Sequence, residues 1–344
     1  MVKALILFSG VILGLVLGLF PTLLKPKPFL WKIVTIVLVT ATILLSFLPP
    51  IGADIETASF ILNAQPRHQL NLKGYVSQIN LEENNKQISI KDDYGKTAQI
   101  TFNNIEFNKD LKIGDFIVMT VSKGSSVDNF NFLRIVSVNP LLTLPYVPKL
   151  EEQIRILNFH VPMAWISVLA YLLAMIYSIK YLKTKDYTND VLAASAAAIG
   201  TLFAILATTT GMIWAKFNWG SFWNWDPRET SIFILLLIYG AYFALRSAID
   251  NPELKARLSS VYSIIAFITV PFLIFILPRL VDSLHPGSAN DDTTGPILST
   301  KEGTLNVFQQ ITFSLGFASF TAIFFWMFNI WSRIVLIFHK KDSY

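Results

Sequence analysis

The sequence has no cysteine among its 344 residues. This excludes disulfide exchange, thiolate metal sites and thioether attachment of a cofactor by this chain, and it suits an oxidising compartment. Charge is also scarce, since 15% of the residues are charged while 53% are hydrophobic, and the mean hydropathy is +0.51. This composition excludes an ordinary soluble domain and indicates a polytopic membrane protein in contact with the lipid bilayer.

Seven apolar segments are long enough to cross about 30 Å of hydrocarbon as helices. They are residues 4–24, 31–48, 154–181, 191–214, 230–249, 258–280 and 307–338. The first resembles a signal peptide, but no small-x-small cleavage site follows it. We therefore predict a retained transmembrane helix and about seven transmembrane helices in all.

Lysine and arginine cluster in four of the segments that border these spans. The clusters are Lys25, Lys27 and Lys32; Lys180, Lys183 and Lys185; Arg246, Lys255 and Arg257; and Arg333, Lys340 and Lys341. The positive-inside rule makes all four cytoplasmic, so that the N-terminus lies outside and the C-terminus inside a bacterial inner membrane. Residues 51–153, 215–229 and 281–306 then face outward. The net charge of +5 reflects this topology and is no sign of nucleic-acid binding.

Residues 51–140 have a different character, because they are polar and alternate as strands do. Five short strands are predicted at residues 72–76, 87–91, 97–102, 115–121 and 130–138. This pattern favours a small all-β barrel of the OB type, inserted on the outer side. Because it lacks a basic stripe with interleaved aromatic residues, we expect a structural or docking module. The remaining domains are then two N-terminal helices in residues 1–50 and a helical region in residues 141–344.

The outward segment between the fourth and fifth spans reads Trp219-Gly-Ser-Phe-Trp-Asn-Trp-Asp-Pro-Arg-Glu-Thr230. Its aromatic rings could stack on a large planar ligand, and Arg228 could pair with the ligand's carboxylates. The alternative is an interfacial aromatic belt, but belts scatter tryptophans along helix ends. Asp226 before Pro227 also fits a helix N-cap followed by proline at the first helical position.

Histidine is also scarce, with four copies. His160 begins the third span and His285 follows the sixth, so the topology brings both to the outer face with the tryptophans. Two neutral imidazoles can ligate an iron centre from opposite sides, and the alternative for each is an interfacial capping histidine. We expect no ligand role for His68, in the β domain, or for His339, in the C-terminal tail.

These segments resemble one known family. Trp219-Gly220, Trp223, Trp225-Asp226 and Arg228 resemble the WWD signature of the haem-handling proteins of cytochrome c biogenesis, which include CcmC, CcmF and CcsA. Phe159-His160-Val-Pro-Met-Ala-Trp165 and Leu284-His285-Pro-Gly resemble the two external histidine motifs of CcmC. The resemblance covers residues 158–331 and implies haem binding on the outer face of an energy-transducing membrane.

By this resemblance, His160 and His285 would be the axial ligands of a transient, non-covalent haem b. The other residues expected at the haem are Trp214, Trp219, Trp223, Trp225 and Asp226 in the region 214–230, and Arg155, Arg228 and Arg279 for the propionates. The protein would be a haem chaperone and not an enzyme. Its implied partners are a haem chaperone or apocytochrome c synthetase and an ABC-type membrane complex.

The chain also departs from the family patterns. The ending Trp225–Thr230 resembles CcsA more than CcmC, yet CcsA and CcmF use additional histidines within their spans, and none is mid-span here. The barrel resembles the haem chaperone CcmE, but residues 137–142 lack its haem-binding histidine. Two other readings remain open. A membrane b-type cytochrome would need mid-helix histidines, and a solute transporter would need ionisable groups near the midplane.

Overall fold

The computed structural model describes residues 2–47, 52–82, 85–92, 95–102, 111–126, 128–139, 154–285 and 307–341. The chain divides into two compact units. The helical unit is Met1–Ser46, Arg155–Thr300 and Gln310–Tyr344, and the strand unit is Phe47–Ile154 and Lys301–Gln309. The boundaries predicted near residues 50 and 140, the segment 286–306 and Pro286-Gly287 beside His285 lie outside the described residues.

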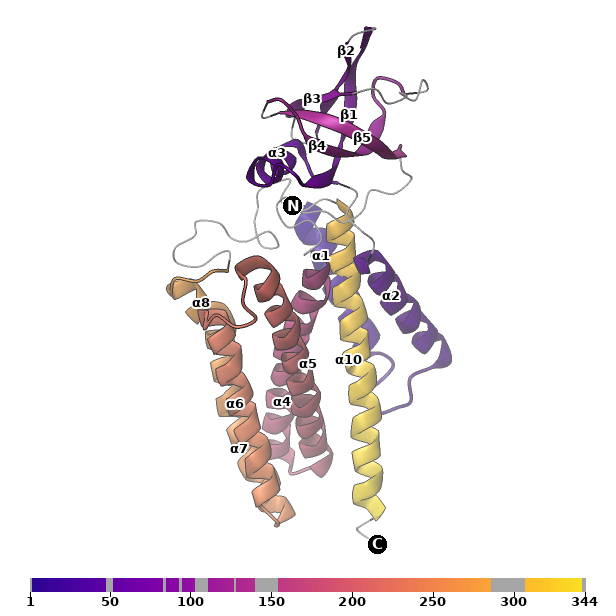
Figure 1. The fold of residues 1–344 in the computed structure, drawn as a ribbon. Coiled ribbons are helices and arrows are strands. Elements are labelled where there is room, and N and C mark those ends of the chain that lie inside the picture. The colour runs from indigo at the N-terminus through magenta and orange to yellow at the C-terminus, as the bar shows by residue number, and fades with distance from the viewer. Residues whose placement is uncertain are drawn as a thin grey trace. The chain divides into compact units, whose positions relative to one another are not determined.

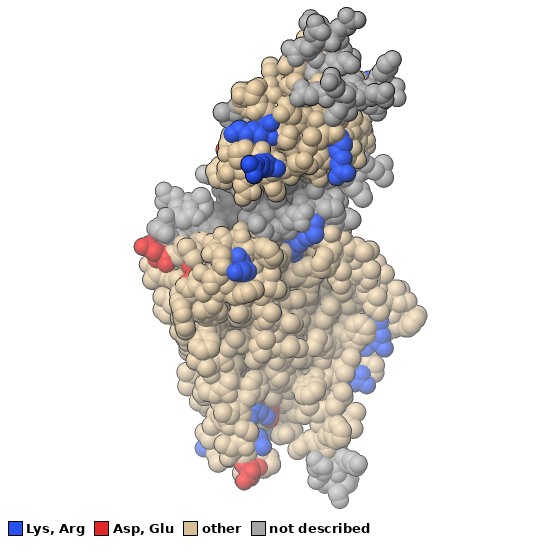
Figure 2. Space-filling model, in the orientation of Figure 1, with Lys and Arg blue, Asp and Glu red and all other residues tan. Residues whose placement is uncertain are grey.

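The helical unit confirms the predicted polytopic helical class (Figure 1). Its helices are α1 Val2–Leu19, α2 Phe29–Phe47, α4 Ile154–Thr184, α5 Tyr187–Trp219, α6 Pro227–Ala248, α7 Pro252–Pro271, α8 Leu277–Leu280 and α10 Val307–Lys341. In the described part of the chain, six helices are long and apolar enough to cross a membrane, and Ala4–Leu19 is a shorter apolar helix. Most of the unit's surface in Figure 2 is uncharged, as contact with lipid requires.

The C-terminal ends of two spans differ most from the prediction. The first helix ends at Leu19 instead of residue 24, because the chain turns at Pro21, which cannot continue a helix. Conversely, α5 continues beyond residue 214 to Trp219. It ends there because Gly220 adopts a left-handed conformation, with φ of 81°, and its N–H bonds to the Lys216 carbonyl. Residues 215–219 of the outward segment are therefore helical and not part of the connection to the next span.

Small and aromatic residues together build the core of this unit. Ala193, Ala196 and Ala197 are buried on α5, as the small-residue pattern of residues 193–200 predicts. Gly200 extends this face, since a Cβ atom there would lie 2.7 Å from the Cβ of Ala170 on α4. The first turn of α5 and the last turn of α6 are also joined by a buried, bidentate ion pair between Asp190 and Arg246, at 2.7 and 2.9 Å.

Proline marks the irregular end of the seventh helix. After Pro271 the chain forms a π-helical turn, η2 Phe272–Ile276, and then the short helix α8. Proline lacks the N–H that the helix needs, which explains the distortion that follows Pro271. The turn carries the chain to Arg279 and on to His285.

A glycine seam attaches the first helix to the last one. Gly10, Gly14 and Gly18 lie four residues apart on α1, and Cβ atoms there would collide with Ser314, Thr321 and Phe325 of α10. Such spacing permits close approach of helices in lipid. The Lys27 ammonium then donates to the carbonyls of Gly18 and Phe20 at the end of α1.

The strand unit contains the predicted barrel. Its strands are β1 Gln69–Glu82, β2 Asn85–Lys91, β3 Thr97–Thr101, β4 Phe116–Lys123 and β5 Asn129–Val138. They pair in the closed order β1-β2-β3-β5-β4, with β4 returning to β1. All pairs are antiparallel except β3 with β5. Five strands in a closed cycle agree with the predicted OB-like architecture.

A helix in this unit was not predicted. Helix α3, Ile55–Ala64, precedes β1 and buries Ile55, Ala58 and Leu62 against the barrel core. The signal was present in the sequence, because the Asp54 carboxylate accepts from the Thr57 N–H and apolar residues follow at helical spacing. The polar, strand-like character of the surrounding residues masked it.

Candidate functional site

Asp226 is the best-connected side chain at the predicted site. It caps the N-terminus of α6, where Pro227 is the first helical residue, as predicted. Its two carboxylate oxygens accept hydrogen bonds from the Arg228 and Leu284 N–H groups, the Ser283 hydroxyl and the His285 ring. Burial alone would raise the pKa of Asp226, but these hydrogen bonds lower it well below its usual range. Asp226 is therefore a buried carboxylate that supports its neighbours, and not part of an exposed platform.

His285 is held in one orientation by this carboxylate. Its Nδ1 lies 2.9 Å from Asp226 Oδ1, and its backbone N–H donates to the Ser283 hydroxyl. Because a carboxylate can only accept, Nδ1 carries the proton, and the lone pair of the neutral ring is on Nε2. Within the described part of the chain, Nε2 of His285 makes no hydrogen bond.

His160 is held in an equivalent way by a different group. It is the seventh residue of α4, and its Nδ1 lies 2.8 Å from the backbone oxygen of Ala207 on α5. Thr210 Oγ1 is a second neighbour at 3.3 Å. Because a carbonyl oxygen can only accept, the lone pair of this neutral ring is again on Nε2. Among the described residues that nitrogen has no hydrogen-bond partner.

The structure brings the two histidines close enough to interact electrostatically. His160 lies within Coulomb range of His285 and Arg228. Arg228 also interacts with Asp226 and Arg279. Because Coulomb interactions weaken with distance, this set marks one cluster at the α4, α5 and α6 ends and the segment after α8.

The four tryptophans do not form one flat surface. Trp219, the last residue of α5, packs edge-on against His285, with ring centroids 4.6 Å apart. Trp223 and Trp225 are perpendicular to each other, with centroids 5.7 Å apart. Trp225 is 71% exposed and holds a positive φ of 56°, which is strained for a bulky residue. Trp214 is buried within α5, so it is not part of an exposed ring surface.

The three predicted arginines differ in position. Arg228 and Arg279 belong to the cluster, half-buried and exposed respectively. Arg155 lies five residues before His160 on α4. At 3.6 residues per turn, five residues rotate the side chain by about 140°, which turns Arg155 towards another face of the helix.

Several residues of this site were not predicted. Glu229 accepts from the N–H groups of Asn224 and Asp226 and completes a capping box with Asp226. The spacing of Asp226 and Glu229 is a sequence signal for that box. Ala207 and Gly211, which contact His160 from α5, had no such signal, because only the crossing of α4 and α5 brings them together.

The other histidines lie elsewhere. His68 is exposed in the strand unit beside Arg67. His339 is part of α10 and stacks on Tyr187 of α5, with centroids 3.8 Å apart, so its predicted place in a C-terminal tail was wrong.

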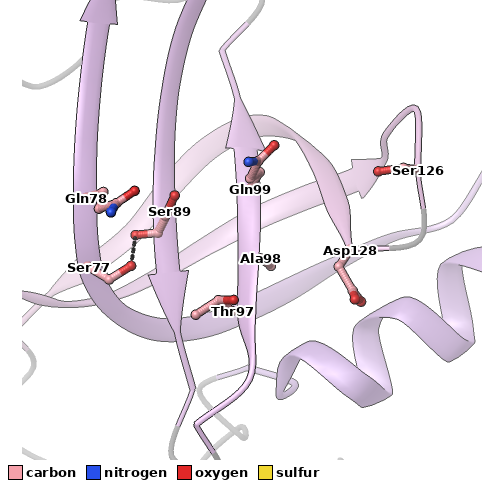
Figure 3. Close-up of a pocket in the computed structure, with 8 residues that line it drawn as sticks. All are labelled: Ser77, Gln78, Ser89, Thr97, Ala98, Gln99, Ser126 and Asp128. Atoms are coloured by element: carbon pink, nitrogen blue, oxygen red, sulfur yellow. Dashed lines mark hydrogen bonds between the residues drawn. The ribbon is translucent and has the colours of Figure 1, made fainter.

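A polar groove of about 570 Å³ lies on the surface of the barrel (Figure 3). Ser77, Ser89, Thr97 and Gln99 are among its lining residues, and Asp128 is its one charged residue. With no ring and no cation in its lining, this groove offers a planar anionic ligand neither stacking nor charge pairing.

Comparison with known proteins points to one family. A family model described as heme exporter protein C matches residues 128–341, more than half of the chain. Heme exporter protein C of Bradyrhizobium diazoefficiens is 38% identical over 36% of this chain and 46% of its own length. The protein of the same name from Paracoccus denitrificans is 31% identical over 40% and 56%. A putative cytochrome c biosynthesis ccmC-like mitochondrial protein of Marchantia polymorpha is 34% identical over 51% and 71%. The chain thus spans about half to 71% of these relatives.

Proposed function

The chain belongs to the heme exporter protein C family, and from this membership we propose that it binds haem at the outer face of the bacterial inner membrane and delivers it for cytochrome c maturation. The observation that carries this proposal is the pair His160 and His285. Each ring has its Nδ1 anchored and an Nε2 that makes no hydrogen bond to the residues that the structure describes.

Iron ligation needs this arrangement. A histidine that ligates a metal through Nε2 commonly donates its Nδ1–H to a carbonyl or carboxylate, which sets the tautomer and the orientation of the ring. His160 has the carbonyl partner and His285 has the carboxylate partner. We therefore propose the two rings as the axial ligands of haem.

The surroundings fit the rest of the haem molecule. Trp219, Trp223 and Trp225 supply aromatic surface, and the perpendicular rings would contact the porphyrin at its edge as well as its face. Arg228 and Arg279 are cations beside the histidines, and we assign them to the propionates. Arg155 is a weaker candidate because of its position on α4. Haem would be held without a covalent bond, as haem b, because exchange of ligands must release it.

Delivery implies partners and an orientation. We propose a haem chaperone or an apocytochrome c synthetase as the acceptor, and an ABC-type membrane complex as the assembly. The acceptor would approach from the outer side, with the barrel on that side and the C-terminus in the cytoplasm. A resident b-type cytochrome is less well supported, because His160 lies near the start of α4 and not in its middle.

Absorption spectra of the detergent-purified protein test the axial pair. We expect a low-spin, bis-histidine haem spectrum for the wild type, and its loss or conversion to a high-spin spectrum in both His160→Ala and His285→Ala. His68→Ala is the matched control, because His68 is exposed in the strand unit, and its spectrum should equal that of the wild type. An unchanged spectrum in either of the first two variants would exclude that residue as a ligand.

A further inference from the structure

His160 does not lie against an ordinary helix surface. Its ring faces Ala207, Thr210 and Gly211 of α5, which are spaced so that they share one face of the helix. Gly211 is the twenty-fifth of 33 residues in α5, where glycine is among the poorest helix formers. Helix propensity therefore gives no reason for glycine at this position.

The space that glycine leaves is filled by the histidine ring. A Cβ atom at residue 211 would lie 2.9 Å from Cε1 and 3.4 Å from Nδ1 of His160. Real Cβ atoms essentially never come as close as 2.9 Å to another atom, so the ring would have to move. Nδ1 is the atom that bonds to the Ala207 oxygen at 2.8 Å, and movement of the ring would lengthen that bond.

We infer that Gly211 is a positioning residue for haem: its missing side chain lets His160 lie against α5, where the Ala207 carbonyl fixes its Nδ1 and leaves Nε2 for iron. The inference rests on the proposed function, which makes His160 a ligand. Gly211 itself touches neither haem nor iron, and it acts only through the imidazole.

The chain offers a matched control. Gly240 is also a helical glycine, in α6, and a Cβ atom there would meet no atom within 4 Å. Gly211→Ala and Gly240→Ala thus make the same chemical change in two helices, and only the first places a methyl group against His160. Both changes favour the helix, so general destabilisation of helices is not expected to distinguish them.

The experiment measures the spectrum and the haem dissociation rate of both variants in the purified full-length protein. We expect Gly211→Ala to convert a large part of the low-spin haem to a high-spin form and to release haem on the order of ten times faster, as loss of a ligand's outer partner does. Gly240→Ala should match the wild type. Gly211→Ala with a wild-type spectrum and rate would overturn the inference, while His160→Ala in the same series still tests the proposed function.

A double variant covers the case of poor folding. If the methyl group acts only through the ring, Gly211→Ala should have no further effect in a His160→Ala background, because the clash is gone. A loss of yield or melting temperature in Gly211→Ala should likewise be recovered in the double variant. Equal losses in the single and double variants would show that residue 211 acts through packing unrelated to His160, and would overturn the inference. A wild-type protein that binds no haem would overturn both it and the proposed function.

Discussion

At the scale of single residues, Asp226 links three features of the site. It caps α6, it receives the segment that carries His285, and it bonds to the ring of His285. The first role was predicted from Asp226-Pro227. The other two could not be predicted, because they depend on residues 283–285 lying beside Asp226 in the folded chain. An anionic partner also makes an imidazole a stronger electron donor, so we expect the carboxylate to strengthen the bond from His285 to iron.

Asp226→Asn separates these roles, because asparagine caps helices about as well as aspartate but carries no charge. We expect haem affinity to fall about 10–100-fold, as is typical for loss of an outer partner of a metal ligand. Haem titration in detergent measures the affinity. Asp282→Asn is the control, because Asp282 is exposed on the same segment. Equal affinities in the two variants would show that the charge does not act on His285.

The lowered pKa of Asp226 predicts how the stabilisation that this carboxylate gives to the site depends on pH. Because the pKa is lowered on folding, the stabilisation is fully present above the carboxyl's ordinary value and is lost only as the pH falls through the lower, folded value. Asp226 should therefore stay ionised across neutral pH.

At the scale of elements, α6 is fixed at both of its ends. The capping box starts α6 at the site, and the Asp190–Arg246 pair joins its other end to α5. The Asp190 side chain is 1% exposed and the Arg246 side chain is 16% exposed, so water stabilises neither charge well and each depends on its ion-pair partner.

Asp190→Asn should destabilise the protein strongly, because Arg246 would keep a buried charge without its carboxylate. Breaking a buried pair in this way costs about 3–5 kcal/mol. The measurement is the melting temperature in detergent at a fixed scan rate. Lys96→Ala is the control, because its pair with Asp128 spans 3.7 Å with both side chains 40% exposed, and such pairs contribute about 0.2–1 kcal/mol. Similar shifts in the two variants would contradict a special contribution from the buried pair.

At the scale of the whole molecule, the family match begins just before β5 and covers β5 and α4 to α10, so α1, α2, α3 and four strands lie outside it. The glycine seam and the bonds of Lys27 show that α1 is packed as part of the helical unit. The proposed orientation of the molecule in the membrane also belongs to this scale.

The absence of cysteine makes that orientation directly testable, since single cysteines can be introduced without background. Thr97→Cys in the barrel and Ser221→Cys beside the tryptophans should react with a membrane-impermeant maleimide from the outer side. Lys183→Cys, in the last turn of α4, should react only once the membrane is permeabilised. All three positions are exposed, so accessibility within the protein does not limit the comparison. Labelling of residue 183 from outside would reverse the proposed topology.

The sequence by itself determined the membrane class, the approximate spans and the barrel strands, and it identified His160, His285 and the tryptophans as candidate site residues. These follow from local patterns, namely apolar length, alternation, capping residues and motif spacing. Only the tertiary structure decided that Asp226 supports His285, that Ala207 and Gly211 hold His160, and that Trp214 is buried away from the ring surface. The physical reason is that these contacts join residues about 50 positions apart, and their geometry depends on how helices cross and not on the local sequence of either partner.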